Sequence, residues 1–223
     1  MTNPNPSLPL STQLRWSARA LQWVRSGRSS TDGLAACPVP LRPAVQALLF
    51  AALRRLGLAQ ALRQQLVPKQ PAPAVDAMLC LGLALLNQTP VPYAPHTLVS
   101  QLVQAAKQQS ATRPMAGLIN ASLRRFLRQS SALLDELKED LTAQYNHPEW
   151  WVNRLRADHP THWQAILRQA MAHPPLVLRI NPLRTSTEQW LRRCQQAGVL
   201  GQALGGSSVW LPHPLPVDRI PGF

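Results

Sequence analysis

The segment from residue 74 to residue 86, AVDAMLCLGLALL, is apolar around nearly its whole circumference if it forms a helix. A surface helix has one apolar and one polar face, whereas a helix without a polar face must be covered on all sides. The longest apolar run, Ala77 to Leu86, is about half as long as a membrane span. The segment therefore predicts the central buried helix of a bundle, and we expect no membrane as a partner.

Amphipathic helices are predicted on both sides of this segment, because apolar residues recur every three or four positions. One such helix carries apolar residues from Leu14 to Val24 and should stop at Gly27, and the next should end at Gly57. The later segments HTLVSQLVQAAK, MAGLINASLRRFLRQ and SALLDELKEDL repeat the pattern, with Met115 and Leu127 expected to face inward. The sequence thus indicates an all-helical region.

The pattern changes after Tyr145. Two short helices bracketed by prolines come first, and then a strand is predicted at LVLRIN, a helix capped by Thr185 or Thr187, and a strand at SSVWLP. A strand, a helix and a strand after an all-helical region predict a second, small α+β unit. The expected fold class is therefore mainly α, with one domain over residues 1–145 and a small α+β domain over residues 146–223.

The charge of the chain favours a polyanionic partner. Basic residues number 23, of which 20 are arginine, against 10 acidic residues, so the formal net charge is +13. Guanidinium groups bind phosphate oxygens in pairs and are weakly hydrated, so this balance is typical of a protein that binds nucleic acid. A general bias toward arginine in the source genome is the alternative explanation.

Several arginines are spaced as a phosphate-binding surface would require. Arg124 and Arg128 are one helical turn apart and project together, and Arg179 and Asn181 share one face if they lie on a strand. The candidate RNA-binding residues are Arg15, Arg19, Arg25, Arg124, Arg125, Arg128, Arg179 and Asn181. An arginine that ties the sheet to a helix is an equally good interpretation of Arg179. The tryptophans at positions 150, 151 and 163 are expected to pack between domains rather than to stack on bases.

No catalytic or metal site is expected in the chain. His159 and His162 have metal-like spacing, with His173 nearby, but prolines separate them and nothing fixes a further ligand. The acidic cluster at residues 135–140 is interpreted as a solvated helical face. Gly205-Gly206 leads into a strand, whereas a phosphate-binding loop opens a helix, so a turn is predicted there. Neither a nucleophile motif nor a P-loop is present.

Four segments resemble one known family in the order that the family has them. RPMAGLINASLRRFLRQSSALLDEL resembles the closing helices of the NusB-like domain that begins bacterial 16S rRNA cytosine-C5 methyltransferases. YNHPEWW resembles the Tyr-Ser-His-Pro-x-Trp signature of that family, LVLRIN resembles its Leu-Arg-Val-Asn strand, and LPVDRIPGF resembles the segment that leads to its catalytic domain. The resemblance implies a NusB-like bundle followed by an RRM-like α+β domain.

In that family a Rossmann-like domain follows, which binds S-adenosylmethionine and uses two cysteines in Pro-Cys and Thr-Cys contexts. The cysteines here, Cys37, Cys80 and Cys194, do not stand in those contexts. The resemblance therefore implies a front region that binds 16S rRNA, carries no cofactor, and works with a methyltransferase domain in cis or in trans.

Two other functions are compatible with the residues. One is a free-standing NusB-like RNA-binding factor in transcription antitermination, which a chain extending beyond Tyr145 disfavours. The other is an adaptor whose bundle binds a protein. Widely separated cysteines and an N-terminal segment without a signal-peptide pattern lead us to expect a cytoplasmic location.

Overall fold

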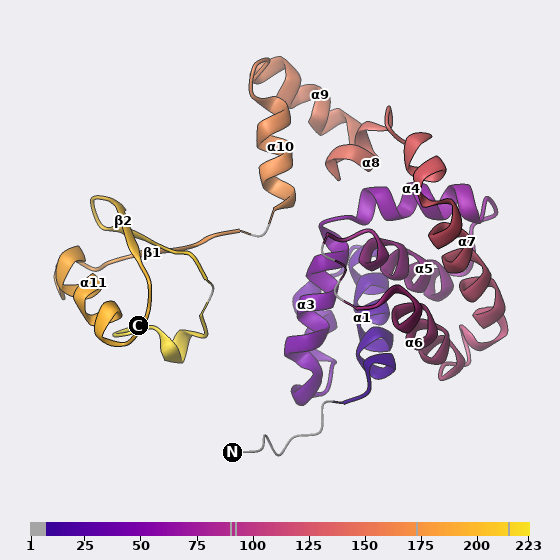
Figure 1. Cartoon of the computed structure of the whole chain (residues 1–223), viewed down its shortest axis with the longest axis horizontal. Coiled ribbons are helices and arrows are strands. Elements are labelled where there is room, and N and C mark those ends of the chain that lie inside the picture. Colours follow the sequence, from indigo (N-terminus) through magenta and orange to yellow (C-terminus); the bar gives the residue numbers. More distant parts are fainter. Residues whose placement is uncertain (1–7, 90, 92, 173, 214) are drawn as a thin grey trace. The chain divides into compact units, whose positions relative to one another are not determined.

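The computed structural model describes residues 8–89, 91, 93–172, 174–213 and 215–223. The described residues fall into two compact units, which divide between Met171 and Ala172 (Figure 1). The first unit is helical, and the second combines one α-helix with a small sheet. The predicted fold class, mainly α with a small α+β part, is confirmed.

The helical unit contains two 3₁₀ turns, Val39–Leu41 and Arg113–Met115, and a series of α-helices. These are α1 (Leu10–Arg25), α2 (Ser30–Ala35), α3 (Arg42–Leu53), α4 (Leu56–Leu66), α5 (Pro73–Leu86), α6 (Pro95–Lys107), α7 (Ala116–Asp135), α8 (Leu141–Tyr145), α9 (Glu149–Asp158) and α10 (Trp163–Met171).

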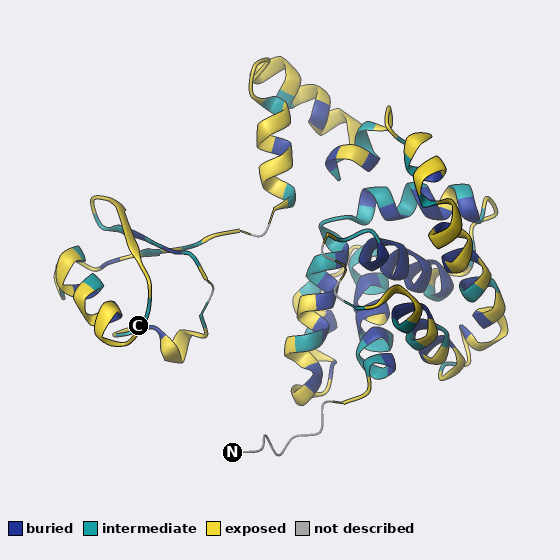
Figure 2. Ribbon diagram, in the orientation of Figure 1, coloured by how far each residue is buried: buried dark blue, intermediate teal, exposed yellow. Residues whose placement is uncertain are grey.

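Helix α5 is the centre of the bundle, as its sequence predicts. Every residue from Val75 to Leu86 is buried, and the helix packs against α1, α3, α4, α6 and α7 (Figure 2). Gly82 permits the closest approach, since a Cβ atom there would lie 2.9 Å from side-chain carbons of both Leu102 in α6 and Leu123 in α7. The absence of a side chain at this position therefore sets the distance between three helices.

The predicted helix ends are right in one case and wrong in another. α1 ends at Arg25, and Gly27 follows with a φ of 86°, as expected for a glycine that stops a helix. Gly57 does not end a helix. α3 already ends at Leu53, and Gly57 lies buried inside α4 against the backbone of Thr142.

Two side chains in the α7 region do not face the core as predicted. Met115, just before α7, is 48% exposed, and Leu127 within α7 is 37% exposed. The buried apolar stripe of α7 runs instead through Ile119, Leu123 and Phe126.

Asn146 links the segment after α7 to the rest of the helical unit by two hydrogen bonds. It adopts a left-handed backbone with a φ of 57° at the end of α8. Its Oδ1 accepts a hydrogen bond from the Gly57 amide (2.6 Å), and its Nδ2 donates one to the Leu53 carbonyl (2.8 Å). The chain therefore continues as part of the helical unit beyond this residue.

Helices α9 and α10 pack on α8 around a second small core. Tyr145, Val152 and Leu167 are its buried members, and the Trp163 ring meets the Tyr145 ring edge-on with centroids 5.2 Å apart. Trp163 thus packs within the helical unit. The compact units accordingly divide after Met171.

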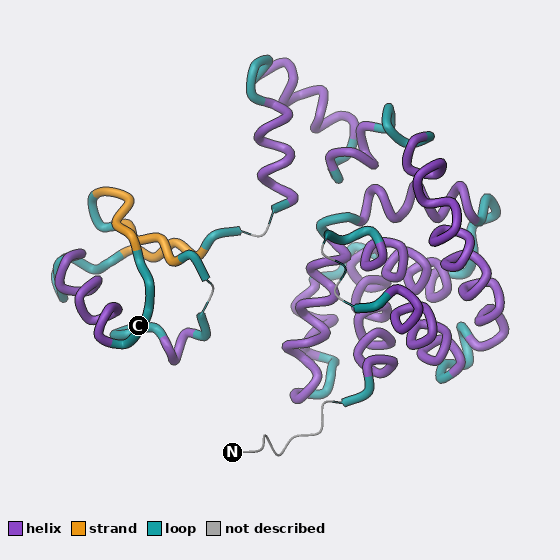
Figure 3. Tube along the Cα trace, viewed as in Figure 1, coloured by secondary structure: helices purple, strands orange, loops and turns teal. Residues whose placement is uncertain are grey.

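The small unit is a three-stranded antiparallel sheet with one α-helix. Its elements are β1 (Leu176–Arg179), α11 (Thr187–Gln196), β2 (Gln202–Gly205), β3 (Ser208–Leu211) and the 3₁₀ turn Val217–Arg219, and the strand order is β1-β3-β2 (Figure 3). Its core contains Trp190 and Cys194 from α11, and Val209 and Leu211 from β3. The β-α-β-β order corresponds to the first four elements of a ferredoxin-like unit.

The turn at Gly205-Gly206 is confirmed, because both residues have positive φ values, 108° and 55°, and join β2 to β3. Strand β2 was not predicted. The cap of α11 is Ser186 rather than Thr185 or Thr187. The Ser186 hydroxyl accepts a hydrogen bond from the backbone N–H of Gln189, and the side-chain Oε1 of Gln189 accepts one from the backbone N–H of Ser186, which makes a capping box.

We expect Asn146→Ala to lower the free energy of unfolding by about 2–4 kcal/mol, since two partly buried hydrogen bonds are lost and alanine is strained in a left-handed backbone. Asn146→Gly should lose about 1 kcal/mol less, because glycine tolerates that backbone. Urea unfolding followed by circular dichroism measures both. An Asn146→Ala variant as stable as the wild type would show that this bridge does not hold α8 in place.

Candidate nucleic-acid interface

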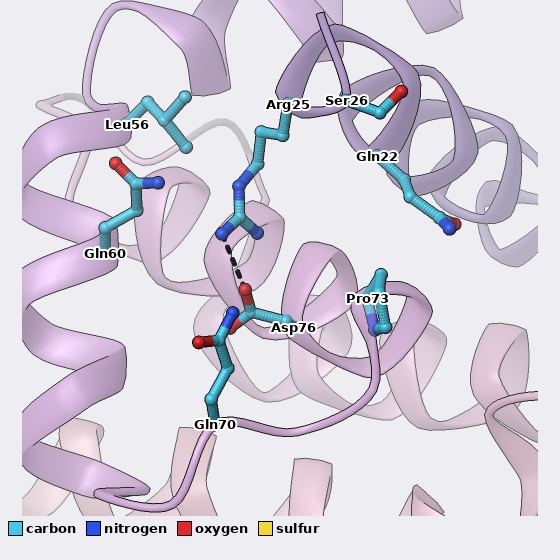
Figure 4. A pocket seen from close by; sticks show the side chains of 8 residues that line it. All are labelled: Gln22, Arg25, Ser26, Leu56, Gln60, Gln70, Pro73 and Asp76. Carbon is cyan, nitrogen blue, oxygen red and sulfur yellow. Dashed lines mark hydrogen bonds and ion pairs between the residues drawn. The ribbon is translucent and has the colours of Figure 1, made fainter.

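The carboxylate of Asp76, in the first turn of α5, lies between two arginines. Its side chain is 2% exposed, and its Oδ2 accepts a hydrogen bond from Arg25 Nη2 at the end of α1 (2.6 Å) (Figure 4). Its Oδ1 lies 2.7 Å from Nε of Arg63 in α4, and this contact is ionic because the two atoms are not aligned as a hydrogen bond. Two guanidinium groups and one carboxylate leave one net positive charge at this place.

Arg25 is therefore not a freely exposed arginine. Its side chain is 19% exposed, and its Nη1 lies 3.8 Å from the Cys80 sulfur in addition to the Asp76 contact. The structure places this predicted RNA-binding residue where α1 meets α5, with its guanidinium group held in a fixed position.

Arginines on the outer side of α1 stack on tryptophans. The Arg19 guanidinium carbon lies 5.0 Å from the centre of the Trp16 ring and 5.3 Å from that of the Trp23 ring. The guanidinium carbon of Arg28, which follows α1, lies 5.4 Å from the centre of the Trp23 ring. These cation–π contacts orient the guanidinium groups and leave their N–H edges available. Trp16 and Trp23 were not among the predicted site residues, although their spacing of seven places them on one face of a helix.

The three predicted arginines of α7 lie together on its exposed side. Arg124 Nε donates to Asn120 (3.0 Å) and Arg125 Nε donates to Gln129 (2.8 Å), both within the helix, and Arg128 is also exposed. The α1 row consists of half-buried Arg15 and exposed Arg19. Helices α5 and α6 each pack against both α1 and α7, so the α1 and α7 rows lie on two different helices that flank this pair.

Most of the positive charge has no acidic partner. In the part of the chain that the structure describes, carboxylates pair with Arg25, Arg63 and Arg154 alone among the 20 arginines. Exposed cations that lack internal counter-charges give a surface potential that attracts polyanions.

Arg179 and Asn181 lie beside one hollow in the small unit. β1 ends at Arg179, so Asn181 is not on the strand, and its Oδ1 instead accepts a hydrogen bond from the Leu183 amide (3.0 Å) in the turn that follows. Both residues nevertheless line a hollow of about 420 Å³ together with Arg184 and Trp190.

The cysteines do not have the properties of nucleophiles. All three are buried, and burial raises the pKa of each thiol. The pKa of Cys80 is raised to about 11 by burial, which the positive charge of Arg25 opposes only in part. A nucleophilic cysteine acts as a thiolate, so these thiols stay in the unreactive form at neutral pH.

Within the described ranges, no group of three or more His, Cys, Asp or Glu side chains could hold a metal ion. His173, considered with His159 and His162, lies outside those ranges.

In the same ranges no single helix is long and apolar enough to cross a membrane. One pair of helices, Val39–Leu53 and Leu56–Leu66, has the required length and apolarity only when the two are taken together, and the pair is bent by 73°.

These features define an arginine-rich helical bundle followed by a small antiparallel α+β unit. Residues 147–218 match the family model described as Methyltr_RsmF/B-like, ferredoxin-like domain. The Ribosomal RNA small subunit methyltransferase B of Citrobacter koseri is 34% identical over 185 residues, which are 80% of this chain and 42% of the relative. The protein of that name from Escherichia coli O6:H1 has the same identity and coverage.

Among solved structures, the crystal structure of PH0851 has a similar fold. The TM-score is 0.57 at 16% sequence identity, and the match covers 96% of this chain and 51% of that chain. At this identity the likeness concerns the fold alone.

The chain belongs to the RsmF/B-like family of ribosomal RNA methyltransferases and corresponds to an N-terminal region of it. It spans less than half the length of these curated relatives.

We expect Asp76→Asn to destabilise the helical unit by about 3–5 kcal/mol, because two largely buried arginines lose their counter-charge. The matched control is Asp158→Asn, which removes the same charge from an exposed pair with Arg154 and should cost less than about 1 kcal/mol. Thermal and urea unfolding of both variants measure the difference. Equal effects would show that the Asp76 cluster contributes no more than a surface ion pair.

Proposed function

We propose that this chain binds ribosomal RNA and positions it for a methyltransferase domain that acts on cytosine C5. The observation that carries the proposal is the exposed arginine row on α7, together with exposed Arg19 and half-buried Arg15 on α1, in a chain that belongs to a family of ribosomal RNA methyltransferases. The relatives' names specify the small ribosomal subunit, and 16S rRNA is therefore the proposed partner.

Phosphate contacts from arginine rows position an RNA without reading its sequence. The α7 row, Arg124, Arg125 and Arg128, and the α1 residues Arg15 and Arg19 would supply such contacts. In the small unit, Arg179 and Asn181 would contact RNA from the hollow that they share. Selectivity would then come from RNA shape and from exposed bases.

The Gly205-Gly206 turn does not have the form of a loop that binds S-adenosylmethionine. A donor-binding loop of the Rossmann type follows a parallel strand and opens a helix, whereas Gly205 and Gly206 close a hairpin in an antiparallel sheet. We infer that the methyl donor and the methyl-transfer chemistry belong to a methyltransferase domain, joined in cis or acting in trans.

The proposed domain organisation remains a NusB-like bundle over residues 1–145 and an RRM-like domain over residues 146–223. The family model, which begins at residue 147, supports that boundary, while the fastening of α8–α10 to the bundle explains why the compact units divide later. The proposed location is the cytoplasm, where ribosomal RNA is modified in bacteria.

We expect replacement of the three α7 arginines by glutamine to weaken binding of single-stranded RNA. A plot of log affinity against log salt concentration has a negative slope, and each lost phosphate contact makes it less steep by about 0.7. The slope of the triple variant should therefore be less steep than that of the wild type by about 2. Fluorescence anisotropy with labelled RNA at several salt concentrations measures both quantities.

The single variants Arg128→Gln and Arg154→Gln provide a matched control, since each removes one exposed arginine and Arg154 already binds Asp158 at 2.7 Å. Only Arg128→Gln should lower the slope clearly. Binding to RNA that does not vary with salt would contradict the proposal and favour a protein-binding adaptor.

We also expect the 223-residue chain alone to transfer no methyl group from radiolabelled S-adenosylmethionine to 16S rRNA. Scintillation counting of the recovered RNA measures this, with an intact methyltransferase as the positive control. Label in the RNA above background would place the chemistry within these residues and overturn the division of labour.

A further inference from the structure

A pocket of about 600 Å³ opens beside the Asp76 cluster, where the end of α1 meets the beginnings of α4 and α5. We call it the Asp76 pocket. Gln22, Arg25, Leu56, Gln60, Gln70 and Pro73 line it (Figure 4). Its volume falls in the range of small-ligand pockets, so one nucleobase fits inside.

Two uncommitted carboxamides face into this pocket. Figure 4 shows Gln60, from α4, and Gln70, from the loop before α5, pointing toward the Arg25–Asp76 pair, whereas Gln22 extends away from it. Within the described residues, the side-chain amides of Gln60 and Gln70 have no hydrogen-bond partner. Each carboxamide offers both donors and an acceptor, which is the mixed pattern that the edge of a nucleobase requires.

The other residues that line the pocket can contact the two faces of a planar base. Arg25 is held by Asp76, so its planar guanidinium group is fixed before a ligand arrives. Unpaired bases in RNA complexes stack on arginine planes and bond along their edges. Leu56 and Pro73 add apolar surface from two other elements.

The arrangement of charge connects the pocket to the α1 arginine row. Arg15, Arg19, Gln22 and the C-cap residue Ser26 are spaced at i, i+4, i+7 and i+11, so they form one stripe along α1 and its end. Ser26 lines the pocket about 10 Å further along the axis than Arg19. A strand whose phosphates contact the two arginines would therefore reach the pocket with its next nucleotides.

An unstacked base fits this site better than an isolated anion does. Arg25, which lines the pocket, and Arg63 both contact Asp76, so an anion would approach a carboxylate that lies between them. A neutral base needs hydrogen bonds and stacking, which Gln60, Gln70 and Arg25 supply.

We propose that the Asp76 pocket holds one unstacked base of single-stranded RNA, which makes the helical unit a sensor of unpaired RNA. The inference rests on the proposed RNA-binding function and specifies the substrate form that this function selects. The arginine rows would bind any RNA backbone, and the pocket would add affinity only where a base is free.

The test uses the double variant Gln60→Leu/Gln70→Leu in the full chain, which removes both carboxamides with little change of volume. Anisotropy titrations compare a mixed-sequence single strand with a duplex of the same sequence. We expect affinity for the single strand to fall about five- to tenfold, as for two lost hydrogen bonds, with affinity for the duplex and the salt slope unchanged. Gln64→Leu, on the exposed side of α4 and outside the pocket, is the matched control and should change nothing.

A second readout is photocrosslinking of single-stranded RNA that contains 4-thiouridine, followed by mass spectrometry of the peptides. Crosslinks are expected at residues 56–73, and they should disappear in the double variant. If the variant binds the single strand as well as wild type, or if crosslinks avoid this segment, the pocket is overturned while RNA binding stands. If wild-type chain binds neither RNA, the proposed function and the inference both fail.

Discussion

The carboxylate of Asp76 is the constraint on which the helical unit depends. It is almost fully buried, and its two oxygens meet Arg25 and Arg63, so one side chain joins the first turn of α5 to the last turns of α1 and α4. A buried ion cluster rarely adds more stability than apolar packing would, but removing one member leaves uncompensated charge. The cluster therefore favours one relative placement of α1, α4 and α5 over alternatives that would leave Arg25 or Arg63 unpaired. The Asp76 pocket lies beside this cluster, between the end of α1 and the beginnings of α4 and α5.

The structure separates the arginines into two physical classes. Arg25 and Arg63 have low exposure and a fixed counter-charge, whereas Arg19, Arg124 and Arg128 are exposed and have no carboxylate partner in the described residues. The fixed class shapes the fold and the walls of the pocket. The free class provides a potential that extends into solvent and is screened by salt. The arginines of the chain thus have two roles: some stabilise the fold, and others create a surface potential. Only the surface potential acts on a partner.

Much of the fold follows from patterns that are local in sequence. The all-round apolarity of residues 74–86 identified the central helix, and Gly27 and the Gly205-Gly206 turn were found from backbone preference alone. The failures have non-local causes. Gly57 was predicted to end a helix. It lies inside α4 instead, where the backbone of Thr142, 85 positions further along the chain, leaves no room for a side chain. Strand β2 has four exposed residues and no apolar alternation, so only its pairing with β3 defines it.

The candidate site was predictable to a similar extent. Helical spacing correctly grouped Arg124, Arg125 and Arg128, because neighbours on a helix are set by periodicity. The role of Arg25 could not be predicted from helical spacing, because its partner Asp76 lies 51 positions away. Asp76 is the one charged residue in a helix that is otherwise apolar. That exception is itself a signal. A single acidic residue in a segment that must be buried on all sides requires a cationic partner. In an arginine-rich chain, that partner is expected to be an arginine that is then not free to bind a ligand. The same reasoning directs attention to the place where the ion pair forms, because polar groups gathered around a buried charge, such as Gln60 and Gln70, are the ones available to bind a ligand.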